Sequence, residues 1–130
     1  MKTLILYSST TGNTKAVAQY MANKTGGTAV DAKKAPADIS GYDTVILGSR
    51  VHAAGISKHI VRFATEREDE LAQKNVAFYL CCMFTDEKAD EQVRATAEKL
   101  GISKGTYFVG GKKLAEDGKQ IDEFLSGIDS

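Results

Sequence analysis

The sequence predicts an α/β protein in which a parallel β-sheet lies between two layers of helices, as a three-layer αβα sandwich. Along 130 residues, short apolar runs alternate with stretches whose apolar residues recur at helical spacing, which is typical of strand-helix-strand crossover units. Three of the runs, Thr3–Tyr7, Thr44–Gly48 and Asn75–Cys81, are apolar at consecutive positions. Strands of this kind are buried on both faces. The length fits one domain spanning residues 1–130.

Five strands are expected in the sheet. In chain order they are Thr3–Tyr7, Thr28–Asp31, Thr44–Gly48, Asn75–Cys81 and Thr106–Gly110. The second and fifth runs lack the continuous apolar pattern of the other three, which indicates that these two strands are more peripheral.

Helices are expected between the strands and after the last one, four or five in all. The four apolar stripes are Val17 with Tyr20 and Met21, Ile56 with Ile60, Phe63 and Ala64, Ala89 with Val93, Ala97 and Leu100, and Ile121 with Phe124, Leu125 and Ile128. Ser57 and Asp86 are placed to be N-caps, and Gly26 and Gly101 to adopt the left-handed conformation after a helix. The stretch Lys33–Tyr42 has room only for a short helix or an irregular connection.

Composition and charge exclude several classes of protein. Seventeen basic and seventeen acidic residues cancel without long runs of either sign, so we expect no nucleic-acid partner. No apolar run is long enough for a signal peptide or a membrane span, and we expect a cytoplasmic protein. Cys81 and Cys82 are adjacent in an apolar run, which suits neither disulfides nor zinc. We interpret them as buried free thiols, with thiol redox chemistry as the alternative.

The stretch LYSSTTGNTKAVA, from Leu6 to Ala18, contains the most informative loop. Ligands of parallel sheets bind beyond the carboxyl ends of strands. The candidate binding loops are therefore Ser8–Thr14, Ser49–Ser57 and Cys82–Asp86. A helix that begins near residue 13 or 14 would direct backbone N–H groups and its positive dipole end at the first loop. With its hydroxyl and amide side chains, this loop is suited to phosphate. The alternative is a turn that only caps its helix.

Other well-known phosphate and catalytic sites do not match. The loop lacks the Gly-Lys-Ser/Thr ending of a nucleotide-triphosphate loop, and Gly12 is its only glycine, where a dinucleotide loop needs three. The first strand ends in Tyr7-Ser8-Ser9, without the acidic residues with which a phosphorylation receiver holds its metal. No spacing of Ser-His-Asp, Cys-His or paired carboxylates stands out.

The run Ser9-Thr10-Thr11-Gly12-Asn13-Thr14, after a strand that ends in Tyr7, resembles the phosphate loop of flavodoxins. GYDTVILGS, from Gly41 to Ser49, is similar to the third strand of that family, and Asn75–Cys81 with its following loop is similar to the fourth. The resemblance implies a flavodoxin-like fold with strand order 2-1-3-4-5 and FMN bound where the order reverses, between strands 1 and 3.

The resemblance also implies the residues that contact FMN. The phosphate would be held by Ser9, Thr10, Thr11, Gly12, Asn13 and Thr14, and the isoalloxazine ring would be flanked by Ser49, Arg50, Val51, His52 and Ala53 and by Cys82, Met83, Phe84 and Thr85. Flavodoxins commonly place Trp or Tyr against the ring, whereas this chain offers His52 and Phe84. His52 is alternatively an exposed loop residue. Arg50 would stabilise a reduced anionic ring, which predicts a less negative reduction potential than that of an acidic flavodoxin.

The leading hypothesis is an FMN-binding electron-transfer protein whose partners are redox proteins or a small electron acceptor. The chain also resembles the flavodoxin-type protoporphyrinogen dehydrogenases in MKTLIL at its start and in the loop Gly48–His52, but it lacks their long insertion near the fifth strand. An FMN-dependent oxidoreductase of that type, or of the quinone reductase type, is one alternative. A cofactor-free interaction module is the other, and the sequence leaves the oligomeric state open.

Overall fold

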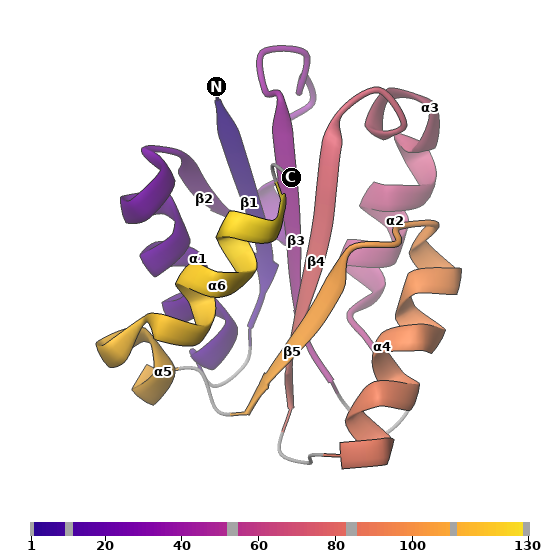
Figure 1. The fold of residues 1–130 in the computed structure, drawn as a ribbon. Coiled ribbons are helices and arrows are strands. Elements are labelled where there is room, and N and C mark those ends of the chain that lie inside the picture. The colour runs from indigo at the N-terminus through magenta and orange to yellow at the C-terminus, as the bar shows by residue number, and fades with distance from the viewer. Residues whose placement is uncertain (1, 10–11, 52–54, 83–85, 110–111, 129–130) are drawn as a thin grey trace.

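A five-stranded parallel sheet forms the centre of the molecule in the computed structural model, which describes residues 2–9, 12–51, 55–82, 86–109 and 112–128 (Figure 1). The strands lie in the order β2-β1-β3-β4-β5, and every neighbouring pair is parallel. Their bounds are β1 Thr3–Ser8, β2 Thr28–Asp31, β3 Thr44–Arg50, β4 Asn75–Cys82 and β5 Gly105–Val109. The predicted fold class and strand order are therefore confirmed.

The carboxyl ends of β1, β3 and β4 extend further than predicted. In β3 the last residue, Arg50, pairs with Cys81 of β4, and the N–H of Val51 donates to the Cys81 carbonyl at 3.1 Å. The prediction that Ser8, Ser49 and Cys82 begin loops is wrong, because all three residues belong to strands. The ladder continues as long as the neighbouring strand supplies partners, and this is not encoded in the local hydropathy pattern.

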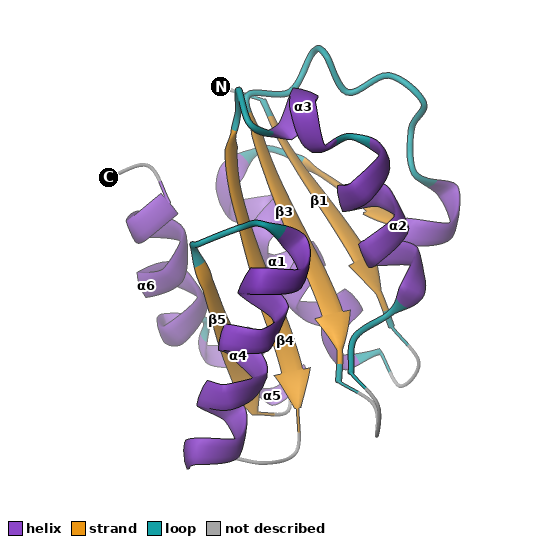
Figure 2. Ribbon diagram, turned by 90° about the vertical axis from the view of Figure 1, so that its right-hand side faces the viewer, coloured by secondary structure: helices purple, strands orange, loops and turns teal. Residues whose placement is uncertain are grey.

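Helices cover both faces of the sheet (Figures 1 and 2). Their bounds are α1 Asn13–Thr25, α2 Lys58–Glu66, α3 Glu68–Leu71, α4 Asp86–Leu100, α5 Lys112–Asp117 and α6 Lys119–Ile128, with a short 3₁₀ helix η1 at Ala32–Lys34. Helices α1, α5 and α6 pack on the face that presents Ile5, Ile46 and Tyr79, and α2, α3 and α4 pack on the opposite face. In the described part of the chain, no helix has the length and apolar character needed to cross a membrane.

Local signals at the helix ends largely agree with the sequence. Ser57 caps α2 by accepting a hydrogen bond from the N–H of His59 at 3.2 Å, and Gly26 and Gly101 adopt left-handed conformations with φ of 70°. Asp86 is the first residue of α4 rather than the residue before it. The end of the chain forms two helices instead of one, because Gly118 with φ of 76° separates α5 from α6.

Candidate functional site

Three loops leave the sheet at one edge, which is the lower edge of Figure 1. They follow β1, β3 and β4, which are adjacent and parallel, with Ser8 beside Ser49 and Arg50 beside Cys81. The structure therefore brings the described parts of the three predicted segments together at the carboxyl ends of the central strands. Seven of the predicted contact residues lie outside the described residues: Thr10, Thr11, His52, Ala53, Met83, Phe84 and Thr85.

The first loop ends in a tight turn that starts α1. Gly12 is the N-cap, with φ of 93°, and its carbonyl accepts the helical hydrogen bond from Ala16 at 2.9 Å. The N–H of Gly12 donates to Oγ of Ser9 at 2.9 Å, so the serine closes the turn. The next N–H groups of the helix, those of residues 13 to 15, have no carbonyl one turn earlier within the helix. Because the first turn contains no acidic side chain, this end of α1 is suited to an anion.

Thr14 connects the start of α1 to strand β4. Its side chain is 1% exposed, its carbonyl accepts a hydrogen bond from the Tyr79 hydroxyl at 2.8 Å, and its hydroxyl is hydrogen-bonded to Cys81. The Thr14 side chain is thus engaged with the sheet, and its backbone N–H is the group that can serve an anion at the helix end.

Ser49 holds both ends of the second loop. The Ser49 side chain is 1% exposed; its Oγ donates to the Arg50 carbonyl at 2.8 Å and accepts from the N–H of Ser57 at 2.9 Å. Val51, also predicted as a cofactor contact, is half-buried and packs against the core on the side of α2. From its place in β3, the buried hydroxyl of Ser49 therefore supports the backbone at both ends of this loop.

The two cysteines are the last two residues of β4, and the third loop follows them. Both are buried and neither forms a disulfide. Burial raises the pKa of Cys81 to about 12, with the neighbouring Cys82 acting in the same direction and the hydrogen bond from Thr14 acting against it. A thiol with so high a pKa is protonated at neutral pH and is a poor nucleophile. This favours the interpretation of Cys81 as a structural thiol over redox chemistry.

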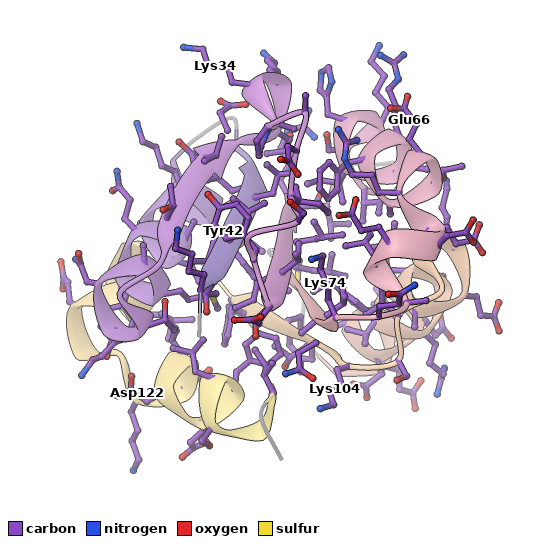
Figure 3. All side chains as sticks on the ribbon, turned by 90° about the horizontal axis from the view of Figure 1, so that it is seen from above. Lys34, Tyr42, Glu66, Lys74, Lys104 and Asp122 are labelled. Carbon is purple, nitrogen blue, oxygen red and sulfur yellow. The ribbon has the colours of Figure 1, made fainter. Side chains whose placement is uncertain are left out.

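At the amino ends of the strands, two lysines hold the backbone in place; Figure 3 shows this end of the molecule from above, with Tyr42, Lys74 and Lys104 labelled. There Nζ of Lys74 donates to the Tyr42 carbonyl at 2.6 Å, and Nζ of Lys104 donates to the Ile128 carbonyl at 2.7 Å. Two cavities, of about 410 and 460 Å³, also lie at the amino ends of the strands. Ligands of parallel sheets bind at the carboxyl ends of strands, so we assign the candidate site to the three loops. The described residues contain no cluster of three metal-ligating side chains.

Sequence reasoning missed one pair of residues that supports the site, Tyr79 and Gly48. The Tyr79 ring is fully buried and lies over Gly48 of β3, where a Cβ would come within 2.5 Å of its Cε1 atom. The hydroxyl then reaches Thr14 in the first turn of α1. A tyrosine inside an apolar strand needs a partner for its hydroxyl, and that requirement is the signal that could have identified it.

The fold and the site together define a flavodoxin-like α/β protein, in which the first turn of α1 lies at the carboxyl ends of the strands of a 2-1-3-4-5 sheet. A sequence model of the flavodoxin domain matches residues 4–114, and the chain belongs to this family. No curated protein sequence matches the chain.

Solved structures share the whole fold. Oxidised flavodoxin 1 from Bacillus cereus has a TM-score of 0.72 at 21% identity, with 97% of this chain and 98% of that chain covered. Oxidised flavodoxin 2 from the same organism has a TM-score of 0.70 at 22% identity, over 99% and 98% of the two chains. A flavoprotein in complex with FMN from Lactobacillus acidophilus has a TM-score of 0.69 at 18% identity, over 95% and 98%. At these identities the likeness shows the fold alone.

Proposed function

We propose that the protein binds FMN non-covalently at the three loops and transfers electrons between a reductant and a redox protein or small acceptor. The observation that carries the proposal is the first turn of α1, which combines the left-handed Gly12, the turn-closing Ser9 and a helix start without acidic side chains. Membership of the flavodoxin domain family supports it. The structural similarity to a flavoprotein in complex with FMN points in the same direction.

The donor set of the first loop fits a phosphate monoester. The N–H groups of Asn13, Thr14 and Lys15 belong to the first turn of α1, where they align with the positive end of the helix dipole. The Lys15 side chain is exposed and adds a positive charge to the same turn. Because Gly12 has no Cβ, a phosphate can approach the backbone of the turn closely. We propose that Thr10 and Thr11 complete this set with their hydroxyls.

The second and third loops would flank the flavin ring. Bound FMN would supply reversible uptake of electrons, and the chain would supply binding, orientation and electrostatics. Ser49 fixes the start and the end of the second loop through its bonds to Arg50 and Ser57. Because both ends of this loop are held, ordering the residues between them on a ring would cost less entropy than ordering a segment with free ends. We propose that Arg50, His52 and Phe84 are the side chains that distinguish this flavin site.

The phosphate assignment is tested by comparing FMN with riboflavin, which lacks the phosphate. We expect FMN to bind at least tenfold more tightly, since about 1.4 kcal/mol corresponds to a factor of ten and charge-assisted hydrogen bonds to a phosphate contribute about that much or more. The measurement is calorimetric titration of the apoprotein with each compound. Equal affinities would contradict the phosphate site. No binding of FMN at tens of micromolar would favour the cofactor-free interaction module.

Electron transfer is tested on the FMN-loaded protein after photoreduction. We expect rapid reoxidation by a small redox protein such as cytochrome c in stopped-flow mixing, followed in the visible flavin bands. Repeated turnover of a soluble quinone, with no transfer to cytochrome c, would favour the oxidoreductase alternative over a carrier. The same measurement at several salt concentrations reports whether charge guides the encounter.

A further inference from the structure

The Tyr79 side chain extends from β4 over the neighbouring strand β3 to the first turn of α1. Its side chain is fully buried, and its ring crosses β3 at Gly48 and packs against Phe108 with ring centroids 5.9 Å apart. The hydroxyl donates to the Thr14 carbonyl at 2.8 Å, across 65 residues of sequence.

The Thr14 carbonyl, which accepts this bond, already has a hydrogen-bond donor within the helix. Thr14 is the second residue of α1, and in an α-helix the carbonyl at that position accepts from the N–H four residues later. The Tyr79 hydroxyl therefore adds a second donor to a carbonyl that the helix already satisfies. This second donor polarises the peptide group between Thr14 and Lys15.

That peptide group ends in an N–H at the start of the helix. Lys15 contributes one of the first N–H groups of α1, which point toward the loop and lack a helical acceptor. A donor on the carbonyl of a peptide polarises the same peptide and strengthens its N–H as a donor, by roughly 10–30% per bond. The bond to Tyr79 also fixes the first turn of α1 relative to β4.

We propose that Tyr79 is a positioning residue for the FMN phosphate, holding and polarising the Thr14–Lys15 peptide through a buried hydroxyl that does not touch the cofactor. This inference rests on the proposed function. Burial raises the pKa of Tyr79 well above its ordinary value, with Cys81 and Tyr7 acting in the same direction. The hydroxyl therefore stays protonated and remains a donor throughout the physiological pH range.

The test compares Tyr79→Phe with Tyr20→Phe. Both variants remove one hydroxyl that ties α1 to another element, because the Tyr20 hydroxyl donates to Oδ1 of Asp122 in α6 at 2.8 Å. Of these two hydroxyls, that of Tyr79 bonds to the first turn of α1 and that of Tyr20 does not. We expect Tyr79→Phe to weaken FMN binding by about three- to tenfold, the range for loss of one neutral hydrogen bond. Riboflavin affinity should not change, and Tyr20→Phe should leave both affinities as in the wild type.

A second measurement needs no ligand. In ¹⁵N-labelled apoprotein, the amide proton of Lys15 should move upfield in Tyr79→Phe and stay in place in Tyr20→Phe, because only the first variant reduces the polarisation of that peptide. Thermal melts followed by circular dichroism would show that both variants are folded. A Tyr79→Phe variant that does not fold would overturn the proposal, since it would give the hydroxyl a structural role.

The remaining outcomes separate this inference from the proposed function. Wild-type protein that prefers FMN over riboflavin, together with a Tyr79→Phe variant of unchanged preference, would overturn the role of Tyr79 and leave the function standing. Equal losses for FMN and riboflavin, or equal losses in the Tyr20 control, would also overturn it. A wild type that fails to bind FMN would refute the proposed function and with it this inference.

Discussion

Replacement of Gly48 by alanine should destabilise the fold, because the Tyr79 ring occupies the space that a side chain would need. A Cβ at position 48 would lie 2.5 Å from Cε1 of Tyr79 and closer still to its Cζ, about 1 Å less than the usual separation of about 3.5 Å between carbon atoms. Gly48 lies in β3, which is paired on both sides, and the Tyr79 ring is fully buried. Neither group can move without disturbing the core.

The cost of this substitution has two parts. Overpacking of a rigid core costs about 2 kcal/mol, and displacement of the ring would break the bond from Tyr79 to Thr14, which adds about 1 kcal/mol. The free energy of unfolding should therefore fall by about 3 kcal/mol in Gly48→Ala. With a urea dependence of about 1.5 kcal/mol per molar, the unfolding midpoint should fall by about 2 M.

Urea unfolding followed by circular dichroism measures this effect, and Gly41→Ala is the matched control. Gly41 has no atom within 4 Å of the position of a Cβ, so the same substitution there should change stability by less than about 0.5 kcal/mol. In a Tyr79→Leu background, Gly48→Ala should cost much less, because the double mutant removes the clash. Equal costs in both backgrounds, or a Gly48→Ala midpoint within error of wild type, would refute the steric argument.

Two further predictions follow from the loop anchors and from the buried thiol. Ser49→Ala should lower the free energy of unfolding by about 1–3 kcal/mol, because the buried N–H of Ser57 loses its acceptor. Ser57→Ala removes only a helix cap and should lower it by about 1 kcal/mol. Thermal melts that rank the two variants in the reverse order would contradict this prediction. The pKa of Cys81 rises from 9.0 to about 12 on folding, so the stability it contributes is complete below about pH 9 and is lost as pH rises toward 12. Urea titrations should therefore show a decline in stability above pH 9 that is less steep in Cys81→Ala, and identical slopes would argue against the shift.

Most of the fold was predictable from the sequence, since the signals are local. The continuous apolar run Thr3–Tyr7 identified a buried strand because burial on both faces leaves no alternation. Gly26 and Gly101 were predicted to adopt the left-handed conformation after a helix, and their φ of 70° confirms that prediction. The division of the last segment at Gly118 was missed, because a helical stripe continues after the break and hides it.

The candidate site was predictable only in part. The position of the first loop followed from the order of a strand, a donor-rich turn and a helix, and the helix begins at Asn13 as expected. The role of Ser49 did not follow, because the partner of its hydroxyl, the N–H of Ser57, becomes a neighbour only when the second loop closes. Sequence chemistry predicts that a hydroxyl can donate and accept, but it does not identify the partner.

Apolar periodicity and turn chemistry act between near neighbours, so the sequence alone was enough to predict the parallel sheet, the approximate strand positions and the loop that we propose holds a phosphate. The groups that support that loop became visible only in the folded molecule. Tyr79, Gly48 and Thr14 come from β4, β3 and α1, and their contact depends on the order in which the strands pair. A hydrogen bond across 65 residues leaves no periodic trace in the sequence, because it depends on distance in space rather than along the chain.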